Sequence, residues 1–342
     1  AMTLSGDQTV TGAATLDAGA ALSISGGTLS VGGALAMESD GTLTVTSTVS
    51  ADRLSLTGTD GVDVSFTGDQ TFSNDATVTT GGDFTVTGGT LDVGGTLAVT
   101  ATGAMDLTGT VNAGVLGLTG AAAMTLSGDQ TVTGAATLDA GGTLTIGGGT
   151  LSVGSALTVE ADDTIAVSST VLAGSLELLA TGSAGAAFTG DQTVTGAATV
   201  VTGGDFTVDG GTLDVGATLA VTATGAMALT GTVNAGVLGL TGAAAMTLSG
   251  DQTVTGTTTL DAGAALSISG GTLSVGGGLT VNADAAIAVT STVQADALTL
   301  TGSAALSLTG DQTITNAATL DAGGTLTIGG GTLSVGSALT VE

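Results

Sequence analysis

The sequence predicts an all-β fold: a three-sided, right-handed parallel β-helix, or β-solenoid, of about 17 coils of about 20 residues each. Three observations predict it. The triplet Gly-Asp-Gln begins at positions 6, 68, 128, 190, 250 and 310, so the chain repeats about every 60 residues. Apolar residues recur in three series at intervals of about 20 residues, and around most of them apolar residues alternate with Thr, Ser or Ala. Such fixed-period self-similarity indicates units that bury their apolar faces by stacking on their neighbours.

The repeats have two longer periods, a block of about 60 residues with three coils and a double block of 122 residues. Ala1–Gly19 is identical to Ala123–Gly141, and Ala136–Glu160 returns unchanged as Ala318–Glu342. We therefore expect a single solenoid domain over residues 1–342, without a linker. Because the chain begins and ends inside a motif and neither end carries an atypical capping coil, we expect it to be a fragment of a longer repetitive protein.

The first strand of each coil is predicted around a regular series of apolar residues. The series is Leu4, Ile24, Val45, Phe66, Val86, Leu107, Leu126, Ile146, Val167, Phe188, Val208, Leu229, Leu248, Ile268, Val289, Leu308 and Ile328. We call the sheet built by these strands face 1. Segments such as Thr-Leu-Thr-Val at 42–45 alternate with period two, as expected for strands with one buried side.

The second and third strands are predicted from two further series. The second trails the first by six or seven residues and begins Val10, Val31, Ala51, and the third follows five or six residues later and begins Leu16, Met37, Leu56. We call the corresponding sheets face 2 and face 3.

Turns are predicted at the Gly-Gly, Asp-Gly and Gly-Asp pairs that separate many strands, where a left-handed backbone is needed. No stretch has the spacing of an amphipathic helix, and 61 glycines disfavour helices. Parallel crossovers are strongly right-handed, which predicts the hand of the coil.

The composition excludes several classes of partner. The formal net charge is −28, from 29 acidic residues against one basic residue, Arg53. Nucleic acid is excluded because phosphate binding needs Lys and Arg, and an anionic membrane surface is excluded for the same reason. No apolar run approaches the ~18 residues of a membrane span, so we expect no membrane insertion.

Catalysis is not expected. The chain has no His and no Cys, so a Ser-His or Cys-His pair cannot form, and zero Cys also excludes a thiolate metal site. Arg53 is the one cationic group that would serve a polysaccharide lyase. A pair of carboxylates acting as a glycosidase is formally open, but the near-constant coil length leaves no long loop to build a cleft. We predict that the chain is not an enzyme and needs no cofactor.

The recurring Gly-Asp-Gln triplet has two interpretations. Each Gln falls at an inward position of face 2, where neighbouring coils carry Leu29 or Val49. It is either a ligand site repeated every third coil, or a corner in which Asp sits in the turn and Gln satisfies backbone groups. Six equal copies favour the corner.

Calcium is the candidate metal. Asp17 and Glu38 fall at equivalent positions of successive coils, about 4.8 Å apart if the strands stack. The same pairing recurs at Asp139 with Glu160, and at Asp321 with Glu342. Paired carboxylates favour a bound cation, and calcium takes carboxylate oxygens. The alternative is a solvated acidic surface that keeps the protein soluble.

Outward positions of face 1 are rich in Thr and Ser. Examples are Thr44 with Thr46 and Thr85 with Thr87. Such an array is able to bind ice or to lie against a neighbouring fibre, but Asp106, Gly147, Ala166 and Asp209 interrupt it. β-Propensity alone also explains exposed Thr on strands.

Two strings resemble a known family. Gly-Asp-Gln-Thr-Val-Thr-Gly-Ala-Ala-Thr-Leu at 6–16 and Gly-Gly-Thr-Leu-Ser-Val-Gly at 26–32 are similar to the repeats of filamentous-haemagglutinin adhesins and autotransporter passengers of type V secretion. The resemblance implies a secreted β-solenoid at the bacterial cell surface.

From the repeat and this resemblance we expect the structural shaft of an extracellular fibre or adhesin. The alternatives are a self-assembling matrix, sheath or surface-layer filament, and a passenger that binds calcium or glycans. The expected partners are neighbouring fibre subunits, or host or cell-surface glycans and proteins bound through regions outside these residues.

Overall fold

A computed structural model describes residues 1–59 and 61–342. The chain divides into two compact units, Ala1–Gly174 and Ser175–Glu342. Each unit is a β-solenoid in which every described strand pairing is parallel, and the two units together hold about 17 coils. That the whole chain forms one domain, and that the coil is right-handed, stay predictions.

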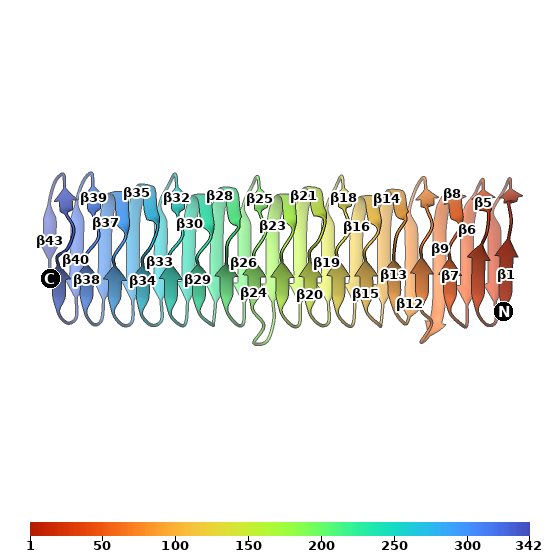
Figure 1. Cartoon of the computed structure of the whole chain (residues 1–342), viewed down its shortest axis with the longest axis horizontal. Coiled ribbons are helices and arrows are strands. Elements are labelled where there is room, and N and C mark those ends of the chain that lie inside the picture. The colour runs from red at the N-terminus through yellow and green to blue at the C-terminus, as the bar shows by residue number, and fades with distance from the viewer. The chain divides into compact units, whose positions relative to one another are not determined.

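Face 1 consists of one short strand from each coil (Figure 1). In the first unit these strands are β1 (Met2–Ser5), β4 (Leu22–Ser25), β7 (Leu43–Val45), β10 (Val64–Phe66), β13 (Phe84–Val86), β15 (Met105–Leu107), β17 (Met124–Leu126), β20 (Leu144–Ile146) and β22 (Ile165–Val167). In the second unit they are β24 (Ala186–Phe188), β27 (Phe206–Val208), β29 (Met227–Leu229), β31 (Met246–Leu248), β34 (Leu266–Ile268), β36 (Ile287–Val289), β38 (Leu306–Leu308) and β41 (Leu326–Ile328). Each contains the predicted apolar residue of its coil.

Faces 2 and 3 are separate strands in the first three coils, in the last coil and in every coil that carries Gly-Asp-Gln. On face 2 these are β2 (Gln8–Val10), β5 (Thr28–Val31), β8 (Thr48–Ala51), β11 (Gln70–Phe72), β18 (Gln130–Val132), β25 (Gln192–Val194), β32 (Gln252–Val254), β39 (Gln312–Ile314) and β42 (Leu333–Val335). On face 3 they are β3 (Ala14–Ala18), β6 (Ala34–Ser39), β9 (Arg53–Asp60), β12 (Ala76–Gly81), β19 (Ala136–Ala140), β26 (Ala198–Thr202), β33 (Thr258–Ala262), β40 (Ala318–Ala322) and β43 (Leu339–Val341).

In the other coils the prediction of three separate strands is wrong, because faces 2 and 3 form one continuous bent strand. These strands are β14 (Thr90–Ala101), β16 (Thr110–Gly120), β21 (Thr150–Ala161), β23 (Thr170–Ala180), β28 (Thr212–Ala223), β30 (Thr232–Gly242), β35 (Thr272–Ala283) and β37 (Thr292–Gly302). The bend is a register shift, for example between Val93 and Thr96 of β14. A bulge of this kind turns a strand without ending it.

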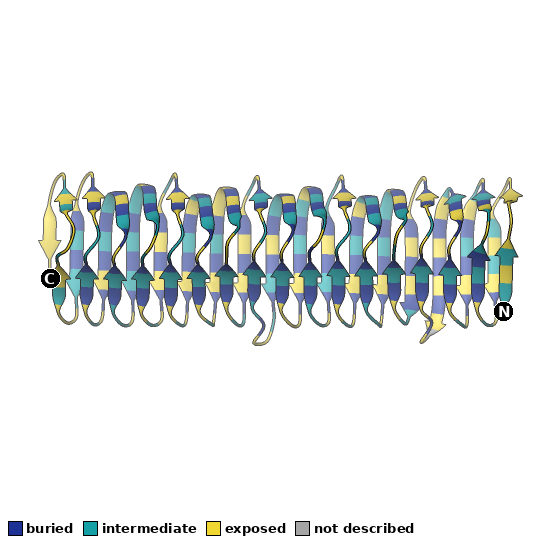
Figure 2. Cartoon of the chain, viewed as in Figure 1, coloured by how far each residue is buried: buried dark blue, intermediate teal, exposed yellow. Residues whose placement is uncertain are grey.

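The predicted inward residues form the core. They are buried along each unit, and only the outermost coils depart from the pattern: Val10 is 36 % exposed and Ile328 45 %. Figure 2 shows buried and less buried residues alternating along the strands. Phe66 packs edge-to-face on Phe84 with ring centroids 5.8 Å apart, and the duplicated pair Phe188 and Phe206 repeats this at 5.7 Å.

At the corner before face 1, a backbone hydrogen bond joins residues three apart in each of two coils that stand 122 residues apart. The Val62 N–H donates to the Thr59 carbonyl, and the Ala184 N–H donates to the Thr181 carbonyl. Figure 1 shows the corner that precedes β24 projecting beyond the corners beside it. The described residues form no helix, and so none that is long and apolar enough to cross a membrane.

Candidate functional site

The Gly-Asp-Gln triplet lies at the corner between face 1 and face 2. Its Asp side chain accepts a hydrogen bond from the backbone N–H of a Thr in the following coil. For Asp129 the donor is Thr150, at 2.9 Å. The other five bonds, of 2.8 to 3.0 Å, are Thr28 to Asp7, Thr90 to Asp69, Thr212 to Asp191, Thr272 to Asp251 and Thr332 to Asp311.

The Gln side chain points inward and donates a hydrogen bond to the preceding coil, whereas the Asp bonds to the following one. Gln130 is 1 % exposed, and its Nε2 donates to the Gly109 carbonyl of the preceding coil at 3.2 Å. Gln70, Gln252 and Gln312 donate in the same way to the carbonyls of Ser47, Gly231 and Ser291. Gln8 in the first coil is exposed and donates to the Ser5 carbonyl of its own coil.

The Gly of the triplet allows the coils to approach each other at this corner. A Cβ on Gly128 would lie 2.1 Å from the Gly109 oxygen, and one on Gly250 would lie 2.0 Å from the Gly231 oxygen. Neither position has room for a larger residue without moving the backbone. The triplet is therefore a clip across three successive coils, with Gly at the contact, Asp bonded to the next coil and Gln to the previous one.

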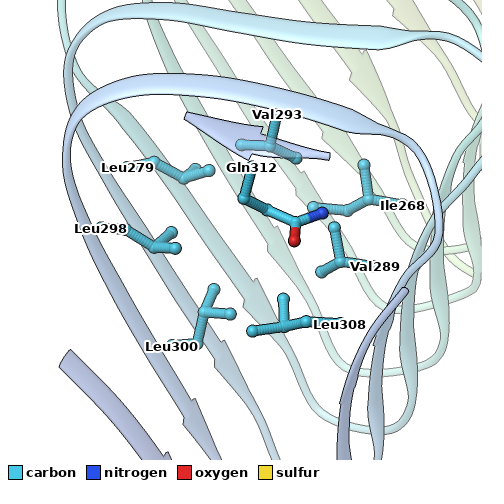
Figure 3. A pocket seen from close by; sticks show the side chains of 8 residues that line it. All are labelled: Ile268, Leu279, Val289, Val293, Leu298, Leu300, Leu308 and Gln312. Atoms are coloured by element: carbon cyan, nitrogen blue, oxygen red, sulfur yellow. The ribbon is translucent and has the colours of Figure 1, made fainter. Parts of the chain in front are cut away.

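The surroundings of the inward Gln side chain do not resemble a ligand site. Figure 3 shows Gln312 projecting among aliphatic side chains of the core, including Ile268, Val289 and Leu308. The space within this described set of side chains is too small for a water molecule. The corner interpretation of the triplet is confirmed.

The carboxylates proposed as calcium ligands lie in neighbouring coils, as their spacing predicts. Asp17 is in register with Glu38, and Asp139 with Glu160. Asp321 lies opposite Glu342, because the Glu342 N–H donates to Leu320 and the Glu342 carbonyl accepts from Ala322. Most of these side chains are exposed, and Asp139 and Asp321 are half-buried.

In the described part of the chain, no third acidic side chain joins any of these pairs. Among the described residues, no group of three or more acidic side chains is placed to hold a metal ion. Calcium takes six to eight oxygen ligands, so a pair alone would leave much of the coordination shell to backbone oxygens or water. Calcium binding therefore stays a prediction.

The bend between faces 2 and 3 leaves shallow hollows on the outer surface. One of about 180 Å³ is lined by Asp92, Asn112 and Thr131 of adjacent coils, and its duplicate of about 180 Å³ by Asp214, Asn234 and Thr253. A hollow of about 260 Å³ is lined by Ser274, Gln294 and Thr313 in the next block. Hydroxyl, amide and carboxylate groups form hydrogen bonds, but none of these hollows contains a group able to act as a cationic base.

Arg53 follows Asp52, which lines a further hollow of about 270 Å³ together with Ser50 and Thr71. Its Nε is 3.7 Å from the Asp52 Oδ2, and the two side chains are 62 % and 42 % exposed. An exposed pair of this kind contributes little to stability, about 0 to 1 kcal/mol. Asp52 also accepts a hydrogen bond from Asn74 at 2.5 Å.

The bond from Asp to the next coil was missed by sequence reasoning, although a signal for it exists. A Gly-Gly-Thr sequence stands one coil after every Gly-Asp-Gln, and its Thr is 21 residues after the Asp. That offset is one coil, so the Thr N–H faces the carboxylate.

Comparison with protein families gave one match. A family model described as haemagglutinin repeat matches residues 1–58, 39–109, 108–183, 171–232 and 274–341, which is most of the chain. No curated protein and no solved structure matched the chain.

Proposed function

Because the chain belongs to the haemagglutinin-repeat family, we propose that it is the non-catalytic structural shaft of an extracellular bacterial surface fibre or adhesin. The observation that supports this most directly is the match of the family model along most of the sequence. Adhesin-like or structural repeat proteins of this kind act through their length and surface rather than through one pocket.

The proposed mechanism is mechanical. Continuous parallel ladders distribute load over many backbone hydrogen bonds, and each coil adds about 4.8 Å of length. The triplet clips tie neighbouring coils together by side-chain bonds to the backbone. A shaft of this kind holds a distal binding region away from the cell, and its own surface carries no residue that we assign to catalysis.

Localisation is tested in the cells that produce the protein. An antibody raised against the 342-residue chain should label intact cells as strongly as permeabilised ones, as measured by flow cytometry. Protease added outside the cells should abolish the label. Labelling that requires permeabilisation contradicts the proposal, whatever the fold of the purified chain.

A second candidate property is calcium binding at the acidic pairs, which the register of Asp139 with Glu160 favours. Two carboxylates about 5 Å apart in water repel each other by about 1 kcal/mol, and a shared cation would relieve this. Calcium should then raise the melting temperature over that in EDTA, and magnesium should not replace it. Glu160→Gln should reduce the rise, whereas equal melting temperatures with calcium and EDTA contradict calcium binding.

A further inference from the structure

Face 1 carries few charged residues for a strongly acidic protein. Its middle outward column in the second unit is Ala187, Thr207, Ala228, Thr247, Ser267, Ala288, Ser307 and Thr327. In the first unit it is Thr3, Ser23, Thr44, Ser65, Thr85, Asp106, Thr125, Thr145 and Ala166. Of the 29 acidic residues, Asp106 and Asp209 occupy the middle outward column and the one two residues later among the described residues of face 1. Three more, Asp63, Asp83 and Asp205, stand at its edge directly before β10, β13 and β27 and are exposed.

The outward columns of face 1 are also regular. Thr85 is in register with Asp106, which is in register with Thr125, and the same ladder continues through the strands of each unit. Most middle-column side chains are half-buried by their neighbours (Figure 2). Because all of them are short, the face offers no long side chain that would hold another surface away.

We propose that face 1 is a docking surface for a second copy of this chain, with face 1 of one copy packed on face 1 of the other. Copies that each carry a net charge of −28 repel one another, and this face is the one through which they approach with the fewest carboxylates. The pairing is isologous, because the same surface is used on both copies. This proposed pairing does not depend on whether the protein lies outside or inside the cell.

Two in-register sheets are suited to this contact. Sheets pack face to face about 10 Å apart, and both copies repeat at the same inter-strand spacing of about 4.8 Å. Hydroxyls of Thr and Ser are able to hydrogen-bond across the interface, and short side chains interdigitate as in dry sheet interfaces.

The available area indicates a weak contact. In the first unit face 1 extends roughly 40 Å along the stacked strands and roughly 13 Å along each strand, so two copies would bury about 1,000 Å². This is near the lower limit for a specific interface. Association should therefore be seen at high protein concentration and should increase with salt, which screens the remaining repulsion.

The duplicated block supplies an internal comparison for a test. Asp106 and Ala228 occupy the same position of two segments, 83–123 and 205–245, that differ at only three positions. One Asp106 carboxylate oxygen is buried without a hydrogen-bond partner. Because the fold holds both Asp and Ala at this position, exchanging them should leave the coil intact while changing the charge of face 1.

The experiment is sedimentation of the 342-residue chain at graded concentrations in ~0.02 M and ~0.5 M NaCl. The mass should rise from 31.6 kDa towards twice that value in high salt. Ala228→Asp should weaken the association at least about threefold, and Asp106→Ala should strengthen it. The control is Ser274→Asp on face 2, which adds the same charge in the column where other coils carry Asp92 and Asp214.

Ser274→Asp should change the association less than Ala228→Asp does. Equal effects of the two variants would show that total charge, not face 1, governs the association, and would overturn the proposal. A chain that stays monomeric up to ~1 mM in high salt would also overturn it. So would a monomeric chain that inhibits ice recrystallisation, because face 1 would then bind ice. Circular dichroism and melting curves verify that each variant is folded.

Discussion

At the scale of single residues, the carboxylate of each Gly-Asp-Gln triplet satisfies a backbone donor of the next coil. The Asp129 Oδ1 accepts from the Thr150 N–H of the next coil. A turn Asp usually bonds to a backbone group within its own turn, whereas here the partner is a whole coil away. Stacking brings the two together, so the bond contributes to the joint between coils.

Replacing this carboxylate should weaken the joint by a measurable amount. Asp129→Ala should lower the free energy of unfolding by about 1 kcal/mol, because one hydrogen bond is lost. Asp129→Asn should have a smaller effect, because its side-chain oxygen still accepts. Urea denaturation monitored by circular dichroism measures both variants.

The matched control for this prediction is Asp139→Ala, which removes an equal charge from the same coil, on face 3. If Asp129→Ala is no more destabilising than Asp139→Ala, the hydrogen bond from Thr150 to Asp129 contributes nothing to stability. The change in unfolding free energy then comes only from the removal of one negative charge.

The buried Gln is the second residue whose role is testable. Gln130→Met retains the volume and removes the Gln130 Oε1, which is buried without a hydrogen-bond partner, yet we expect it to destabilise the protein by about 0.5 to 1.5 kcal/mol. The reason is that the Gly109 carbonyl loses the donor that satisfies it. A thermal melt compares this variant with Val111→Met, an apolar exchange in the same column. A gain in stability for Gln130→Met would contradict the role of the amide.

The inward position of Gln130 was predictable from the sequence, because it stands two residues before an apolar residue of face 2. Its carbonyl partner was not, because that depends on the path of the backbone around the corner of the preceding coil. The partner of Asp129 was also missed, since sequence reasoning considered contacts within the turn and not across coils.

At the scale of elements, the length of the strands departs from the sequence prediction. The run Gly276-Gly277-Gly278 contains the Gly-Gly pair that the sequence associates with turns, but it lies inside the continuous strand β35. Three glycines in a row do not reveal which of them permits a close contact. The structure distinguishes them: a Cβ on Gly276 would lie 2.3 Å from the Thr255 oxygen, and one on Gly278 would have nothing within 4 Å.

These two glycines provide a matched pair of substitutions in one strand. Gly276→Ala should destabilise the protein by roughly 1 to 3 kcal/mol, because a backbone must move to accommodate the methyl group. Gly278→Ala should be neutral or stabilising by up to about 1 kcal/mol, because it restricts the unfolded chain. Melting temperatures of the two variants check this order. Similar losses for both would mean that the bend tolerates no side chain anywhere.

At the scale of the whole molecule, the 122-residue period should act as a unit that is removable without disturbing the fold. Deleting residues 98–219 joins Leu97 to Ala220 and restores the local sequence Thr-Leu-Ala-Val. Each remaining strand then keeps its inward side, so we expect a cooperative melt within a few degrees of the parent. Circular dichroism should show the same strand signal per residue.

The control deletion differs by one residue. Removing 98–218 leaves Leu219 after Leu97 and shifts the strand by one position, which exchanges its inward and outward residues. This variant should melt at least several degrees lower. Equal stability of the two deletions would contradict the strict alternation on which the core depends.

The number of coils, their parallel register and their inward residues were predictable because the repeat imposes one pattern on every coil. Ala136–Glu160 and Ala318–Glu342 show how far this extends, since they are identical in sequence. The boundary between the two compact units, after Gly174, was not predictable. No Pro, Gly run or change of composition marks it in the sequence.

The clips have a consequence for the protein under tension. A clip at Gln130 adds a side-chain bond to seams whose ladder is short, since β16 pairs with β18 and β19 through eight residues. The seam between β14 and β16 has no triplet bond, but it has ten paired residues. The clips therefore offset the shorter ladders, and a chain pulled from its ends should release its length coil by coil. Each step would free about 20 residues, or about 70 Å of extended chain. Single-molecule force spectroscopy would record a sawtooth with that spacing, and the protein would absorb sudden loads by sacrificing one coil at a time.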